Sequence, residues 1–252
     1  MVWCLLVAFA AAATAQDPSQ VVARSVEAER ANRQRMAMYL FREDVRQKQF
    51  DRDGKFLSQR TLTYDVLILE GRPYHRRVAL DGVPLSPEEE ARELELMDKV
   101  ATQRRRNPAA RAESERKRRV VPYDQLDRLH TLRLVREERA CWVIGGSPKR
   151  GARARTADEE RLRNSKVTVW IDKATLHRVR MEVSGEHGEH TLFEFGQRDG
   201  DIWLIARIVA RQRQGKAILE TEQVYSNYRR FTSESSVTVQ GEGSPPGAAP
   251  EL

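Results

Sequence analysis

The run SKVTVWIDKATLHRVRMEV, from Ser165 to Val183, decides how this chain folds. It is followed by HTLFEFGQRDGDIWLIARIVARQ at 190–212 and by KAILETEQVYSNYRRF at 216–231. β-Branched and aromatic residues crowd these runs, and short groups of turn residues separate them at 172–175, 185–188, 199–200 and 214–215. This spacing predicts five consecutive antiparallel strands joined by hairpins.

Alternation along these strands predicts one apolar face and one wetted face. The apolar face carries Val167, Val169, Ile171, Val179, Met181 and Val183. The polar residues Arg178, Arg180 and Glu182 fall on the other face, together with Trp170. Since a sheet with an apolar face requires a second layer, the remaining chain must supply its cover.

Upstream of this meander, the sequence predicts a helix, three strands and a helical insertion. The helix covers Gln20 to about Tyr39, and the strands cover 40–50, 55–69 and 74–80. In the insertion, 86–129, the tetrapeptide Ser86-Pro87-Glu88-Glu89 forms a capping-box pattern that begins a helix at Pro87. We expect this helix to run to about Arg105 and to be followed by shorter helical stretches up to Leu129.

Two further strands are predicted at 131–136 and 140–144. They are followed by a basic loop at 145–164 that is nearly free of large apolar residues, with one helical turn around Asp158 to Leu162. Residues 232–252 show no core-forming pattern and are predicted to be a disordered tail. The fold class is therefore α+β and mostly antiparallel β. We expect one domain at 16–231: a curled half-barrel sheet of about 10–11 strands, with helices covering its concave face.

The first 15 residues, MVWCLLVAFAAAATA, are an uncharged apolar run that ends in the small-x-small pattern of a signal-peptide cleavage site. We therefore expect export to the periplasm or cell envelope. The formal net charge of +7 fits an anionic membrane surface better than nucleic acid in that compartment, although a solubilising basic surface is the simpler explanation. Cleavage after Ala15 would leave Cys141 as the one cysteine, predicted to be a buried and inert thiol.

Several short motifs resemble those of exported bacterial proteins that are similar to outer-membrane lipoprotein-sorting proteins. The motifs are Gly71-Arg72-Pro73-Tyr74, Asp81 to Ser86, Leu132 to Val135, Trp170-Ile171-Asp172-Lys173, Phe193-Glu194-Phe195 and Tyr225 to Phe231. The resemblance covers about 28–231 and implies the lipoprotein-carrier (LolA-like) fold, an unclosed antiparallel barrel with helices over an apolar cavity. It implies no catalytic residues.

The first functional hypothesis is a periplasmic carrier or chaperone that shelters the acyl chains of a lipid or acylated lipoprotein in an apolar cavity. The predicted cavity lining is Leu62, Tyr64, Val66, Val169, Met181, Phe193 and Phe195. The predicted membrane-facing basic residues are Lys149, Arg150, Arg153 and Arg155. The alternative is a non-enzymatic interaction module of the envelope, whose core is filled by its own helices and which has no lipid ligand.

No residue pattern in the chain predicts catalysis, a cofactor or a metal site. The segment Glu186-His187-Gly188-Glu189-His190 has metal-ligand residue types, but a glycine-containing hairpin tip does not present two histidines as a zinc helix does. We therefore expect an exposed polar turn there. The sequence also lacks a phosphate-binding glycine loop and a nucleophile elbow, so we expect a binding protein and not an enzyme. We also expect the protein to be a monomer.

Overall fold

The computed structural model describes residues 16–36, 39–107, 123–198 and 202–231. The predicted signal peptide at 1–15 and the predicted tail at 232–252 lie outside the described residues. So does most of the linker between the two parts of the helical insertion, at 108–122.

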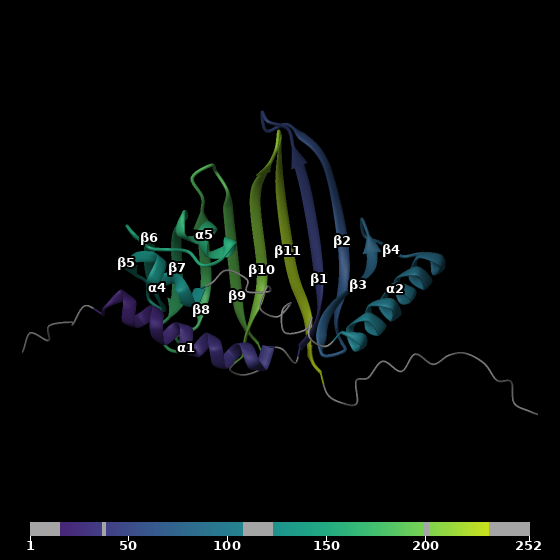
Figure 1. Ribbon diagram of the computed structural model, residues 1–252, viewed down its shortest axis with the longest axis horizontal. Helices are drawn as coiled ribbons and strands as arrows, with labels where there is room; N and C mark the ends of the chain where they lie inside the picture. The colour runs from purple at the N-terminus through teal and green to yellow at the C-terminus, as the bar shows by residue number, and fades with distance from the viewer. Residues whose placement is uncertain (1–15, 37–38, 108–122, 199–201, 232–252) are drawn as a thin grey trace, which may run out of the picture.

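Eleven antiparallel strands form one sheet in the order β4-β3-β2-β1-β11-β10-β9-β8-β7-β6-β5 (Figure 1). Their bounds are β1 Tyr39–Phe50, β2 Phe56–Leu69, β3 Arg72–Leu80, β4 Val83–Pro84, β5 His130–Glu137, β6 Cys141–Pro148, β7 Lys166–Asp172, β8 Arg178–Ser184, β9 His190–Arg198, β10 Ile202–Gln214 and β11 Ala217–Arg230. The five predicted strands of the meander are β7 to β11, in the predicted order. The pairing of β1 with β11 brings the first and the last of the described strands side by side in the middle of the sheet.

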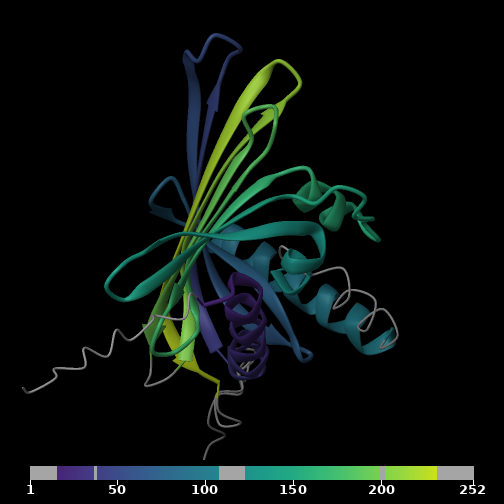
Figure 2. The same ribbon diagram turned by 90° about the vertical axis from the view of Figure 1, so that its left-hand side faces the viewer.

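The sheet twists strongly along its length and stays open, as the side view in Figure 2 shows. The predicted α+β class with a curled, unclosed antiparallel sheet is confirmed. Besides the strands, the described part of the chain contains α1 (Pro18–Met36), α2 (Pro87–Arg106), the 3-10 turn η1 (Tyr123–Gln125), α4 (Leu126–Leu129) and α5 (Ala157–Arg163). The predicted first helix thus ends at Met36, and Tyr39 already belongs to β1.

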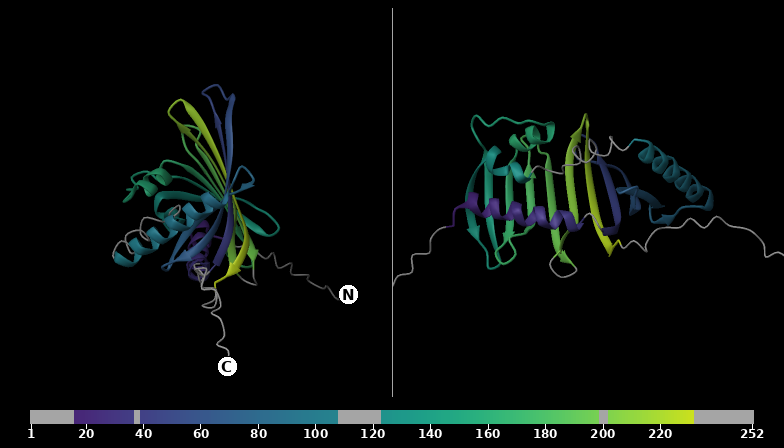
Figure 3. Two further views of the ribbon diagram at one scale, coloured as in Figure 1. Left: turned by 90° about the vertical axis from the view of Figure 1, so that its right-hand side faces the viewer. Right: turned by 60° about the horizontal axis from the view of Figure 1, so that its bottom comes forward.

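The main core lies between the half of the sheet that contains β6 to β10 and the helices α1, α4 and α5. Helix α1 runs across these strands, whereas α2 lies beside β3 at the opposite end of the sheet (Figures 1 and 3). We call the side of the sheet that α1 covers the helix face. The most enclosed core residues are Val22, Leu126, Leu129, Ile144, Val169, Ile171 and Met181.

Polar contacts hold α1 in place near both of its ends. The amide of the buried Asn32 donates to the carbonyl of Trp203 in β10 (2.6 Å) and accepts from the amide nitrogen of the same residue (2.9 Å). Near the other end, the hydroxyl of Ser19 donates to Asp127 of α4 (2.7 Å). Asn32 therefore acts as a one-residue extension of the strand hydrogen bonding, which satisfies a side chain that would be costly to bury alone.

Helix α2 begins with the predicted capping box. The amide of Glu89 donates to the Ser86 hydroxyl (3.3 Å), and the Glu89 carboxylate accepts from the amide of Ser86 (2.9 Å). These hydrogen bonds from Ser86 hold the pKa of Glu89 below its usual value. A lowered carboxyl pKa means that the cap stabilises the folded helix above the ordinary glutamate pKa and loses this effect as the pH falls through the lowered value.

Replacing Ser86 with alanine is expected to lower the free energy of unfolding by about 1 kcal/mol, because the first turn loses its side-chain acceptor. Urea denaturation followed by far-UV circular dichroism measures this change. The matched control is Ser58→Ala, at an exposed serine of β2 that takes part in no helix cap. Equal, negligible losses for the two variants would contradict the capping role.

The predicted basic loop at 145–164 is too long, whereas the helical turn predicted within it, around Asp158 to Leu162, is present as α5. Residues 145–148 belong to β6, and residues 157–163 form α5, so the loop is confined to 149–156. The sequence favours a turn at Gly145 and Gly146, but both residues belong to β6, and side chains of β5 pack closely against them. A Cβ on Gly145 would lie 2.9 Å from Val135 Cγ2, and one on Gly146 would lie 3.2 Å from His130 Cβ. Close packing of neighbouring side chains, and not a turn, requires glycine here.

Candidate functional site

A cleft opens on the helix face between α5, the β8–β9 hairpin and β10. Its volume is about 560 Å³, which lies within the range of roughly 300–1,000 Å³ that small-molecule pockets occupy. Helix α5 forms one wall, and its position is fixed by Thr156, whose hydroxyl accepts from the amide of Glu159 at the first turn (3.1 Å). Arg128 of α4 reaches the Glu159 carboxylate (2.5 Å) and so ties this wall to the core.

The floor of the cleft is apolar, and its rim is charged. The apolar lining residues are Leu162, Val183, Phe193 and Ala210. The charged or titratable lining residues are Asp158, Arg161, Glu186, His187, Glu189 and Arg211. Such a site suits a molecule with an apolar body and a polar or ionic end, because the body replaces water over the floor while the end stays solvated at the rim.

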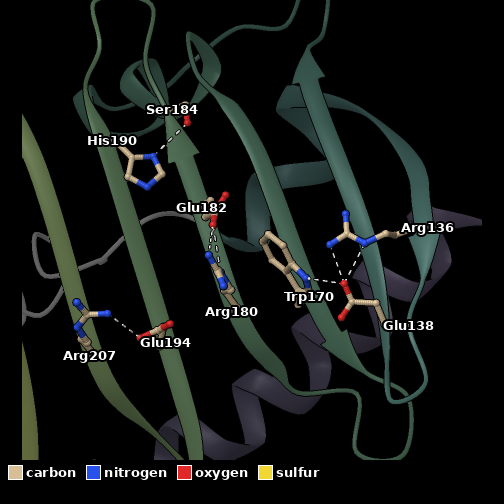
Figure 4. A network of polar contacts seen from close by, with 9 residues as sticks. All are labelled: Arg136, Glu138, Trp170, Arg180, Glu182, Ser184, His190, Glu194 and Arg207. Atoms are coloured by element: carbon tan, nitrogen blue, oxygen red, sulfur yellow. Dashed lines mark hydrogen bonds and ion pairs between the residues drawn. The ribbon is translucent and has the colours of Figure 1, made fainter.

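The histidines of the 186–190 segment are not brought together. His187 lines the cleft, whereas His190 lies on the opposite side of the sheet, where its Nδ1 is 3.3 Å from the Ser184 hydroxyl (Figure 4). The Glu189 carboxylate accepts from the amide of His187 (3.1 Å) and so organises the turn. Within the described ranges, no three histidine, cysteine, aspartate or glutamate side chains are gathered closely enough to hold a metal ion.

The structure separates the seven predicted lining residues into two groups. Val169, Met181, Phe193 and Phe195 belong to or pack against the core on the β6–β10 half of the sheet, and of these only Phe193 reaches the cleft. Leu62, Tyr64 and Val66 lie on β2, which β1 and β11 separate from β10. Val169 and Met181 are completely enclosed, so the helices of the chain itself occupy the space next to them.

Neither a known family model nor a curated protein matches the chain. Among solved structures, it is similar to a DUF1329 family protein from Desulfovibrio piger at 14% identity and a TM-score of 0.39, covering 86% of this chain and 95% of that one. A LolA superfamily protein from Nitrosomonas europaea matches at 11% identity and a TM-score of 0.35, covering 86% and 94% of the two chains. A domain from Vibrio parahaemolyticus, described as outer membrane lipoprotein-sorting, matches at 12% identity and a TM-score of 0.38, covering 84% and 94%.

The predicted membrane-facing residues Lys149, Arg150, Arg153 and Arg155 are all exposed on the 149–156 loop. This loop leads directly into α5, and its residues therefore come just before one wall of the cleft. None of the described helices combines the length and the apolar composition that crossing a membrane requires. Cys141 is partly buried, and burial raises the pKa of its thiol, which disfavours the reactive thiolate.

Arg178 is a residue whose environment the sequence pattern misplaced. Simple alternation puts it on the wetted face with Arg180, but the register of β7 and β8 shifts between the pairs Trp170/Arg180 and Ile171/Arg178. This β-bulge at Val179 turns Arg178 onto the helix face. The guanidinium there lies between the rings of Tyr123 (4.5 Å) and Phe195 (4.4 Å), and its Nη2 is 3.4 Å from a Glu29 carboxylate oxygen of α1.

A second polar group on the helix face was also absent from the sequence prediction. The side chain of Glu43 is only 3% exposed, and its carboxylate lies 2.8 Å from His75 Nδ1 and accepts from the Gln223 amide (2.7 Å). Burial, together with the Glu43 charge, raises the pKa values of Tyr225 and Tyr64. These residues come from β1, β2, β3 and β11, so their meeting depends on a strand pairing that no local pattern reveals.

The opposite face of the sheet carries a ladder of charged pairs (Figure 4). Arg136 donates to Glu138, Arg180 contacts Glu182 and lies over the Trp170 ring (4.9 Å), and Arg207 is 3.3 Å from Glu194. Trp170 is on this face as predicted. Since exposed ion pairs each contribute at most about 1 kcal/mol, we regard this ladder as a solvated surface.

Proposed function

We propose that the protein is an exported carrier or chaperone that shelters an acyl chain of a lipid or acylated lipoprotein in the cleft beside α5. The observation that carries this proposal is the combination of an apolar floor with a charged rim in one cleft of the helix face. Each methylene group moved from water onto such a floor contributes about 0.8 kcal/mol. The headgroup or peptide end would remain at the rim, near Arg161 and Arg211.

The basic loop supports a membrane encounter for this carrier. Lys149, Arg150, Arg153 and Arg155 are exposed next to the α5 wall, and each basic side chain near an anionic bilayer contributes about 1 kcal/mol of attraction. In this proposal the chain is a single domain at 16–231 that acts as a monomer after removal of the 1–15 signal peptide. It performs no chemistry of its own.

The proposal assigns different roles to the predicted lining residues. Phe193 contacts the ligand together with Leu162, Val183 and Ala210, whereas Val169, Met181 and Phe195 support the floor from within the core. Leu62, Tyr64 and Val66 belong to the other half of the helix face, where they would line a continuation of the site for a second or longer chain.

Filling the cleft with an indole tests the proposal. In Ala210→Trp, we expect the affinity for a fluorescent fatty-acid probe to fall at least about tenfold, because the new ring occupies the space of the ligand. Ala91→Trp is the matched control, since Ala91 is exposed on α2, far along the sheet from the cleft. Organic extraction and mass spectrometry of the purified wild-type protein should also yield copurified lipid.

The second candidate is the non-enzymatic interaction module with a self-filled core. The complete enclosure of Val169 and Met181 by α1 and α4 favours it for that part of the sheet. Repeatedly lipid-free protein, with no binding of the probe by wild type or by Ala91→Trp, would reject the carrier and leave this second candidate. Equal affinity in wild type and Ala210→Trp would instead place the ligand elsewhere than in the α5 cleft.

A further inference from the structure

An arginine-rich pocket lies where β1, β2, β3 and β11 come together, on the half of the sheet away from the α5 cleft. Its volume is about 390 Å³. The charged residues in its wall are Arg42, Asp65, Arg76, Arg229 and Arg230. Four guanidinium groups and one carboxylate give this small volume a formal charge of +3, so its charge is far from balanced.

Strand register places most of these side chains side by side. Arg42 is directly opposite Asp65, Asp65 is directly opposite Arg76, and Leu40 is directly opposite Arg229. Directly opposed residues share a face, and so do residues two apart on one strand. Leu40, Arg42 and Arg229 therefore share the face opposite to the buried Glu43, which is the face away from α1.

Asp65 is shared between two arginines and cannot neutralise both. Its Oδ1 accepts from Arg42 (Nη2 at 3.1 Å), and its Oδ2 accepts from Arg76 (Nη2 at 3.2 Å). The Nε of Arg76 is buried and has no hydrogen-bond partner in the described part of the chain. Donors that are held in place and left unused are what a bound anion would satisfy.

The last two arginines of β11, Arg229 and Arg230, are exposed, and the side chain of neither makes an ion pair or hydrogen bond with any residue in the described ranges. They reach the pocket because β11 is bulged. Three steps along β11, from Ser226 to Arg229, match only two along β1, and Asn227 takes a left-handed backbone with φ at 52°. Asparagine tolerates this conformation better than most residues, and the bulge bends the strand end.

We propose that this arginine pocket binds a phosphate group. Guanidinium forks match the oxygens of phosphate in geometry as well as charge, and a formal excess of +3 suits a group that carries up to two negative charges. The pocket wall also contains Leu40, Phe41, Val66 and Leu67, so the phosphate can carry an organic substituent. Inorganic phosphate and a phospholipid headgroup share this chemistry, and they are separated by the experiment below. The site is independent of the α5 cleft.

The test uses the full mature chain with two probes at low ionic strength. Inorganic phosphate binding is measured by calorimetry, and binding to vesicles of phosphatidylglycerol or of phosphatidylcholine is measured by cosedimentation. The double variant Arg229→Ala/Arg230→Ala should bind the phosphate-bearing probe about tenfold more weakly. Because the guanidinium group of neither arginine has a partner among the described residues, the unfolding midpoint of the double variant should match that of wild type. The control is Arg24→Ala/Arg33→Ala, which removes the same charge from two exposed positions of α1.

The outcomes separate the sources of the phosphate. Pocket-dependent binding of inorganic phosphate supports a soluble phosphate ligand. Pocket-dependent binding of phosphatidylglycerol vesicles without binding of inorganic phosphate supports a headgroup. Equal losses in the two double variants would show that only net charge matters and would overturn the proposal, as would the absence of binding to both probes. Loss of fatty-acid binding in Ala210→Trp with intact phosphate binding would keep the two sites distinct.

Discussion

Arg178→Ala is expected to lower the free energy of unfolding by about 3 kcal/mol, one of the two largest single-residue effects that we expect in this protein. The substitution removes a guanidinium that is enclosed by the Tyr123 and Phe195 rings and leaves the Glu29 carboxylate of α1 without its partner. The side chains of Arg178 and Glu29 are only 11% and 14% exposed. Solvent therefore cannot replace the lost contacts, as it does on a surface.

The matched control lies two residues away on the same strand. Arg180 also contacts an aromatic ring and a glutamate, but its side chain is 42% exposed on the opposite face. We expect Arg180→Ala to cost less than about 1 kcal/mol. Urea denaturation of both variants measures the difference, and Arg178→Met separates packing from charge because it keeps most of the apolar stem. Similar small losses for Arg178→Ala and Arg180→Ala would mean that the bulge at Val179 does not bury Arg178.

Met181→Ala is the second large expected effect, with a loss of about 2–5 kcal/mol in the free energy of unfolding. Met181 is completely enclosed between the sheet and the helices, and its sulfur accepts a hydrogen bond from Arg178 Nη1 (3.0 Å). Truncation would leave a void that rigid neighbours fill only partly. Val135→Ala, at a residue 45% exposed on β5, is the control and should change stability by less than about 0.5 kcal/mol.

This measurement also decides between two roles of Met181. If Met181 is a core residue, its truncation lowers the stability of the protein while the fatty-acid probe still binds to the folded protein. A residue that lines an open cavity would behave in the opposite way, with little change in stability and a clear change in probe affinity. Because Arg178 and Met181 are in contact, the double variant should lose less free energy of unfolding than the sum of the losses in the two single variants.

Local signals in the sequence predict most elements of this fold, although not the short strand β4 or the full length of β6. The hairpins of the meander, the capping box at Ser86 and the acidic first turn of α2 depend on residues a few positions apart, which a pattern can detect. Gly145-Gly146 shows the limit of this reasoning. The same dipeptide suits a turn or a crowded strand, and only the neighbouring side chains of His130 and Val135 decide between them.

The candidate sites depend on relations that the sequence does not contain. A single bulge at Val179 moves Arg178 from water to the core, while alternation before and after it stays intact. The Glu43 group and the arginine pocket both require β1 to lie beside β11, although more than 150 residues separate these strands in the chain. Strand alternation is enough to place Phe193 on the apolar face of the sheet. The α5 wall of the cleft lies in a segment where the sequence predicts one helical turn within a basic loop, and no local pattern indicates that this turn packs opposite Phe193.

The β1–β11 pairing also determines when the protein can fold. Hydrogen bonding along β1 is complete only when β11 (Ala217–Arg230), the last of the described strands, is present. Pairings between such distant segments have a high entropic cost of loop closure and make folding slow. The nascent chain therefore cannot complete the pairing of β1 and β10 until residues 217–230 have been synthesised. A chain shortened before residue 217 would expose both β1 and β10 as unpaired edges, which are sites of aggregation.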